Sequence, residues 1–117
     1  MLFRSSDRPA RLQDNAPVFA ALGDPTRLRL VARLCERGPL SIARLADGVT
    51  VSRQAVAKHL RALEEAGLVH GTRAGRESVW ELRPARLAQV RRALERISSD
   101  WDAALGRLRL MVEDEAP

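Results

Sequence analysis

Apolar residues recur at helical spacing through the first third of the 117-residue chain and predict two helices. The first spans residues 11–22 and carries Leu12, Phe19 and Leu22. Gly23 ends it, and Asp24 followed by proline is typical of the N-cap and first residue of a second helix. The apolar positions of the second helix, spaced i, i+3, i+4 and i+7, are Leu28, Val31, Ala32 and Cys35. We therefore expect Cys35 to be a buried small hydrophobe rather than a reactive thiol.

A short helix and a longer basic helix follow. Residues 41–47 predict the short helix, and residues 48–51 form a tight turn that begins with glycine. Ser52 caps the longer helix, which ends near Ala66, and Gly67 follows as its C-terminal glycine. Two helices joined by a short glycine-containing turn, the second of them basic, are typical of a helix-turn-helix.

The pattern changes to period two after Gly67. Residues 68–73 and 76–82 predict two strands joined by a turn at Ala74 and Gly75. Trp80 and Leu82 share one face of the second strand, which we expect to point inward. The result is a β-hairpin with an arginine-bearing tip, and a helix-turn-helix followed directly by such a hairpin is a winged helix.

A long helix begins at Pro84 and runs past Met111. Its apolar residues are spaced alternately three and four apart, and this unbroken heptad seam consists of Leu87, Val90, Leu94, Ile97, Trp101, Ala104, Leu108 and Met111. A domain of this size cannot bury the full length of such a stripe. The seam therefore favours a homodimer.

These elements predict a mainly α-helical fold with a small β-hairpin, in the order α-α-α-α-β-β-α. The whole is one winged helix-turn-helix domain over residues 10–112, which serves both DNA binding and dimerisation. Residues 1–9 are expected to be a disordered N-terminal tail, and residues 113–117 an acidic tail.

The fourth predicted helix has two different faces. At 100° per residue, Val56, Leu60 and Leu63 cluster on one face, with His59 at its edge as a packed, hydrogen-bonded histidine. Polar residues lie opposite and can enter the major groove, where arginine pairs with guanine and glutamine with adenine. The candidate DNA contacts of this helix and of the hairpin are Ser52, Arg53, Gln54, Ala57, Lys58, Arg61, Arg73 and Arg76.

These candidates divide into two roles. Arg53 and Gln54 lie at the helix N-terminal end, which reaches base edges, whereas Lys58 and Arg61 are better placed for phosphates. The hairpin arginines can neutralise phosphates or enter the minor groove. Any exposed helix face carries polar residues, so the helix alone does not decide between DNA binding and a surface used only for protein contacts. The basic hairpin beside it favours DNA.

Composition and charge agree with this interpretation. Hydrophobic residues make up 45% of the chain and aromatic residues only 3%, so the core must be built from aliphatic side chains, which disfavours a β-sandwich. The net charge of +5 is concentrated between residues 27 and 92, where fourteen basic residues face six acidic ones. Nineteen of the twenty basic residues are arginine, and a GC-rich genome alone would also give many arginines. The positive charge by itself therefore does not establish binding to nucleic acid.

Other functional classes lack their motifs. The sequence contains no glycine-rich phosphate loop, nucleophile elbow or metal-ligand cluster, so we expect no enzyme and no cofactor. Charged residues interrupt the N-terminal segment where a signal peptide needs apolar ones, and no apolar run is long enough to span a bilayer. The single cysteine excludes an intramolecular disulfide. We expect a cytoplasmic protein that binds no membrane.

The residues resemble the ArsR/SmtB family of winged-helix repressors over about residues 11–110. Three segments carry the resemblance in the order and spacing of the family: residues 21–30, residues 52–63 with 66–69, and Gly75-Arg76 with residues 80–82. The resemblance implies a homodimer, paired through its first and last helices, that binds an operator with dyad symmetry and represses until an effector releases it. The implied interface residues are Leu12, Phe19, Leu94, Ile97, Trp101 and Leu108.

The chain departs from the metal-sensing members of that family. Ser41 and Ala43 stand where those members have two cysteines, and no histidine follows His70 in the segment where zinc sensors have ligands. Residues 100–105 look more like members without a metal site. We therefore expect no response to metals. The alternatives are a thiol or metal sensor that uses Cys35, and a winged helix used only for protein contacts.

Overall fold

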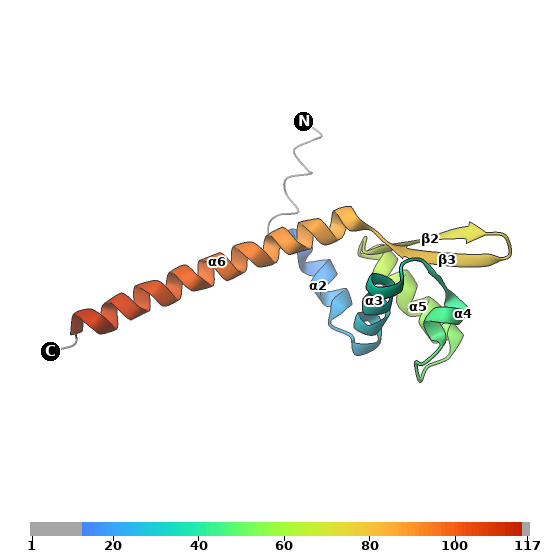
Figure 1. Ribbon diagram of the computed structural model, residues 1–117, viewed down its shortest axis with the longest axis horizontal. Coiled ribbons are helices and arrows are strands. Elements are labelled where there is room, and N and C mark those ends of the chain that lie inside the picture. The colour runs from blue at the N-terminus through green and yellow to red at the C-terminus, as the bar shows by residue number, and fades with distance from the viewer. Residues whose placement is uncertain (1–12, 116–117) are drawn as a thin grey trace, which may run out of the picture.

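The computed structural model describes residues 13–115, and the chain folds into a helical head with a small sheet and one long helix (Figure 1). The predicted N-terminal tail and Leu12 lie outside the described residues. The elements, in chain order, are η2 (Gln13–Asn15), α2 (Ala16–Leu22), α3 (Pro25–Arg37), β1 (Leu40–Ser41), α4 (Ile42–Ala46), α5 (Arg53–Glu65), β2 (Val69–Ala74), β3 (Glu77–Leu82) and α6 (Pro84–Glu115).

Side-chain caps fix where the helices of the head begin. The Asp24 carboxylate accepts a hydrogen bond from the backbone N–H of Arg27 at 3.0 Å, and the Ser52 hydroxyl accepts one from Ala55 at 3.1 Å. Both caps confirm the sequence prediction. Ser41 caps α4 in the same way, so that the short helix starts one residue later than predicted.

The core lies between α3, α4, α5 and the start of the sheet. Its largest fully buried side chains are Leu30, Leu34, Leu45, Leu60, Leu63 and Leu68. Helix α2 adds Val18 from one side, and Trp80 on β3 closes the sheet side, as predicted for its inward face. Burial of these aliphatic side chains is the main source of stability for the head.

The predicted buried face of α3 is wrong in part. Leu28 is 52% exposed, and Ala32 and Cys35 are exposed as well, so Val31 is the one residue of the predicted stripe that is buried. Leu30 and Leu34 face the core instead. Helix α3 is apolar on two sides, because Leu30 and Leu34 form a second stripe on the face opposite Leu28 and Cys35. Hydrophobic spacing alone cannot choose between two such stripes. Contact with α5 and β3 selects the face that is buried.

The sheet has three strands rather than the two predicted. Its order is β1-β3-β2, and all pairs are antiparallel. The two-residue strand β1 pairs Leu40 with Trp80, which joins the hairpin to the segment that follows α3. The hairpin turn is formed by Gly75 and Arg76, one residue later than predicted, because Gly75 has the positive φ of 65° that such a turn needs at its first position.

Helix α6 crosses the head near its start and then extends away from it alone (Figure 1). Val90 and Ala93 are buried against the head, and Leu87 packs against its core. From Leu94 onward the apolar side chains of the seam are exposed apart from Ala104, which is half-buried. The helix continues through Glu115 and so includes the first three residues of the predicted acidic tail. The fold is a winged helix-turn-helix with a protruding C-terminal helix.

Candidate nucleic-acid interface

Helix α5 presents one buried and one exposed face, as the sequence predicts. Val56, Leu60 and Leu63 are fully buried against the head. The opposite side carries five exposed residues and the half-buried Ala57; the exposed ones are Ser52, Arg53, Gln54, Lys58 and Arg61. The buried face holds the helix on the domain, so that the polar face is displayed on a rigid element.

The hairpin of β2 and β3 projects from the head on the side away from the long part of α6 (Figure 1). Arg73 lies on β2 opposite Ser78, and Arg76 lies in the turn itself. Both arginines are exposed. The sequence predicted Arg76 as the first residue of the second strand. The one-residue shift of the turn instead places Arg76 at the tip of the wing.

The cationic side chains of this surface have no acidic partners. Within residues 13–115, the ion pairs are His59 with Asp24, His70 with Glu81, and Arg91 with Glu95. None of them involves the arginines or the lysine of the predicted DNA-binding set. Their charges are exposed to solvent and free to neutralise phosphates.

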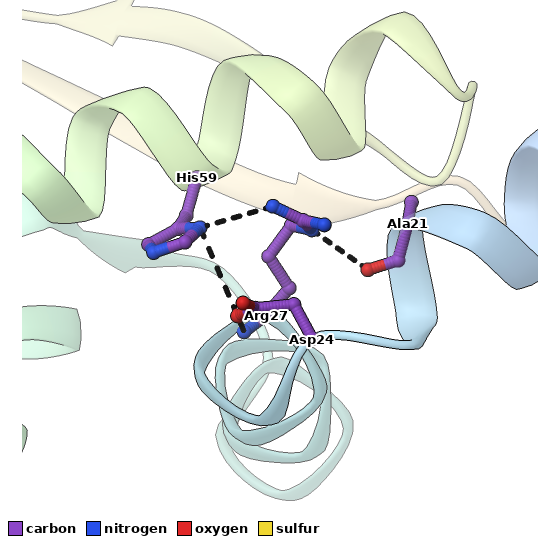
Figure 2. A network of polar contacts seen from close by, with 4 residues as sticks. All are labelled: Ala21, Asp24, Arg27 and His59. Carbon is purple, nitrogen blue, oxygen red and sulfur yellow. Dashed lines mark hydrogen bonds and ion pairs between the residues drawn. The ribbon is translucent and has the colours of Figure 1, made fainter.

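A polar network joins α5 to the helices before it (Figure 2). The Arg27 guanidinium donates to the Ala21 carbonyl at 2.7 Å and lies 3.2 Å from Nδ1 of His59 on α5. The same His59 nitrogen is 3.9 Å from the Asp24 carboxylate. His59 is thus packed and hydrogen-bonded, as predicted. The sequence assigned no such role to Arg27, which connects the end of α2 to the middle of α5.

Asp24 carries its charge in this network. The backbone N–H of Arg27 holds the pKa of the Asp24 carboxyl below its ordinary value, and the nearby His59 and Arg27 side chains act in the same direction. Partial burial of the carboxyl opposes them. The cap of α3 is therefore strongest when Asp24 is ionised.

A second arginine holds the turn of the helix-turn-helix. Arg33 on α3 donates to the carbonyl oxygens of Leu45, at 3.4 Å, and of Asp47. Gly48, the next residue after Asp47, adopts a positive φ of 86°, which glycine reaches without strain. No sequence pattern pointed to Arg33, because the contact joins residues more than ten positions apart.

Metal sites and membrane spans are both absent from the part of the chain that the structure describes. No cluster of three or more histidine, cysteine, aspartate or glutamate side chains that could hold a metal ion occurs over residues 13–115. Ser41 and Ala43 lie around the start of α4, and Cys35 lies on the outer face of α3. None of the helices in the same range is both long and apolar enough to cross a membrane.

Comparisons with known proteins agree with this architecture. A family described as "Helix-turn-helix domain" matches residues 22–72. The HTH-type transcriptional regulator Rv2034 of Mycobacterium tuberculosis is 37% identical over 113 residues, which cover 97% of this chain and 94% of that protein. The structure of an ArsR-like transcriptional regulator from Rhodococcus sp. RHA1 is 41% identical with a TM-score of 0.70, and the match covers 85% of this chain and 92% of that one.

A third similar protein has a described assembly. The homodimeric winged helix-turn-helix DNA-binding domain Mb0332 from Mycobacterium bovis is 26% identical with a TM-score of 0.58, over 76% of this chain and 82% of that domain. The family match covers the helix-turn-helix and ends within β2. The chain belongs to the ArsR/SmtB family of winged helix-turn-helix transcriptional regulators.

Proposed function

We propose that the chain is a sequence-specific transcriptional repressor that binds an inverted-repeat operator as a homodimer. The exposed face of α5 supports this function, because Gln54 and unpaired cationic side chains lie there on a helix whose other face is fully buried. A rigid helix with this face fits the major groove of B-DNA. The exposed Arg73 and Arg76 of the wing supply further charge for phosphates.

Each side chain has a role in this proposal. Arg53 and Gln54, in the first turn of α5, read base edges, and Ser52 and Ala57 lie close to the same groove. Lys58, further along α5, and Arg76, at the tip of the wing, contact phosphates. Arg61 and Arg73 add to the phosphate contacts. The chain is not an enzyme and acts on DNA in the cytoplasm.

The homodimer is supported by the free part of α6. Ile97 and Trp101 are 40% and 66% exposed, and Leu94 and Leu108 on the same seam are exposed as well. A contiguous apolar stripe of this length on a soluble head needs a cover, and a second copy of the same helix offers a matching stripe. Phe19 on α2 is half-buried and lies in the other helix that the family resemblance assigns to the interface.

Regulation is proposed to be independent of metals. Ser41 and Ala43 offer no thiolates, and the described chain has no imidazole after His70. Zinc, cadmium or arsenite should therefore leave operator affinity unchanged. Cys35 is exposed, and this favours the alternative of a thiol or metal sensor that uses Cys35 over a buried role for this residue. A tight stoichiometric zinc site that weakens DNA binding, and that Cys35→Ser removes, would establish that alternative instead.

The inverted repeat can be tested after selection of bound duplexes from a random pool. A symmetric dimer should select two half-sites whose centres lie about one helical turn, ~10 bp, or a multiple of it apart. Inserting about half a turn between the half-sites turns one site to the other side of the duplex and should abolish dimer binding. Insertion of a full turn is the control. Selection of no common sequence would refute sequence-specific binding and favour a winged helix used for protein contacts.

A further inference from the structure

A cavity of about 550 Å³ lies beside the helix-turn-helix, between the end of α3, helix α4 and the start of α5. Four arginines, four apolar side chains and one aspartate line it. The arginines are Arg33, Arg37, Arg44 and Arg53, and the larger apolar residues are Leu40 and Val51. The cavity thus combines positive charge with an apolar wall.

The charge of this cavity is not neutralised by the protein. Asp47 is its one acidic lining residue, and no arginine of the lining forms an ion pair with a carboxylate over residues 13–115. Like charges that converge on one cavity repel each other, so the arrangement is stabilised when an anion enters. Guanidinium groups offer planar pairs of N–H donors, which match the oxygens of phosphate and carboxylate groups.

The arginines differ in how free they are to bind. Arg33 already donates to the carbonyl oxygens of the turn, so it is held in place. Arg37, Arg44 and Arg53 are exposed, and within the described residues no hydrogen bond from their side chains is found. Three guanidinium groups therefore remain available around a cavity whose fourth arginine fixes its shape.

We propose that this cavity binds a small organic anion, with an oxyanion group held by Arg37, Arg44 and Arg53 and a compact apolar body against Leu40 and Val51. A free organic anion fits better than a backbone phosphate of DNA, because the phosphate alone would leave the apolar wall and much of the volume unfilled. The ligand is thus defined by its two parts, one anionic and one apolar.

A consequence for regulation rests on the proposed function. Arg53 is the first residue of α5 and one of the side chains proposed to read bases. An anion bound in the cavity engages this guanidinium and competes with DNA for it. Because coupling between two sites is reciprocal, bound operator lowers the affinity for the anion by the same factor. The cavity is then an effector site that weakens operator binding.

The binding site is tested first on the full chain without DNA. Phenyl phosphate serves as the probe and is titrated by calorimetry and by amide chemical shifts at constant ionic strength. We expect one molecule per chain, with shifts at Ala43 and Val51, and binding about tenfold weaker for inorganic phosphate, which lacks the apolar body. Arg37→Gln should weaken phenyl phosphate about tenfold by removing a charged donor. Arg107→Gln, an exposed arginine on distal α6, is the matched control.

The second arm adds the selected operator. Saturating phenyl phosphate should weaken operator binding about tenfold for the parent protein, and Arg37→Gln should need about tenfold more phenyl phosphate for the same effect. Absence of phenyl phosphate binding to the free chain overturns the proposal whatever the chain does with DNA. If the free chain binds no phenyl phosphate but Arg44→Gln weakens DNA binding, the cavity holds a backbone phosphate of DNA instead of a free anion. Binding of the probe by a chain that binds no DNA would support the site and refute the proposed function.

Discussion

The recognition helix α5 and the C-terminal helix α6 are both amphipathic, but they differ in what covers their apolar faces. All three aliphatic residues of the α5 face are fully buried by the head. On α6 only Val90 and Ala93 are buried, and the seam beyond them is mostly exposed. The apolar face of α5 is therefore covered within one chain, whereas most of the apolar face of α6 is left uncovered by its own chain.

This difference in burial suits the two helices to different proposed roles, α5 to DNA binding and α6 to dimerisation. The buried side of α5 and the contacts of Arg27 hold this helix on its own domain, as the proposed binding of DNA requires. A helix that joins two copies must keep its apolar side free until they meet. The free part of α6 extends away from the wing, so pairing through it would leave the polar face of α5 uncovered (Figure 1).

The largest expected effect is loss of the dimer when charge is placed on the exposed apolar seam of α6. The double substitution of Ile97 and Trp101 by glutamate would place unpaired charge in the interface and should convert the dimer to a monomer at micromolar concentration. Light scattering measures the mass, and circular dichroism checks that the helix content is kept. Leu110→Glu is the control, because this leucine is 60% exposed but lies off the seam. A parent protein that is already monomeric would refute the dimer.

A smaller effect is expected where α5 is tied to the head. Arg27→Gln removes the donor to the Ala21 carbonyl and to His59, and should lower the free energy of unfolding by about 1–3 kcal/mol. Denaturant unfolding measures the change. Arg29→Gln is the control, because Arg29 is exposed and makes no side-chain hydrogen bond within the described residues. Equal losses in the two variants would mean that the Arg27 network does not hold α5.

The smallest effect concerns the charge of Asp24 in the same network. Its pKa is lowered from the ordinary value of 3.8, so its ionised form contributes stability that is fully present above that value and is lost as the pH falls below it. Asp24→Asn keeps a capping oxygen but removes the titration. The variant should be less stable than the parent near neutral pH, and the difference should shrink below pH 3.8, as measured by unfolding at a series of pH values. A constant difference would refute the electrostatic role.

The sequence predicted elements whose signals are local. The caps Asp24 and Ser52, the two faces of α5 and the seam of α6 all follow from the spacing and chemistry of nearby residues. The buried face of α3 could not be chosen, because two apolar stripes compete on that helix. Strand β1 was missed, because two residues carry no period and pair with β3 only in the folded chain.

The candidate site divides in the same way. The positions of the exposed residues on α5 and the wing were predicted from helical and strand periodicity. Arg27 and Arg33 were not predicted as positioning residues, because their partners His59 and Asp47 are distant in sequence. The arginine-lined cavity was missed for the same reason, since it gathers side chains from three helices and the segments between them. Contacts of this kind are defined only by the tertiary fold.

A salt titration of two variants on operator and on random duplexes shows whether α5 and the wing read DNA. Gln54→Ala should cost roughly 1–3 kcal/mol on the operator and leave random DNA unchanged, because it removes an interaction with a base. Arg76→Ala should weaken both duplexes alike and reduce the salt slope by about 1 for each phosphate that a subunit no longer neutralises. If both variants instead bind both duplexes like the parent protein, α5 and the wing are not the surface that reads DNA.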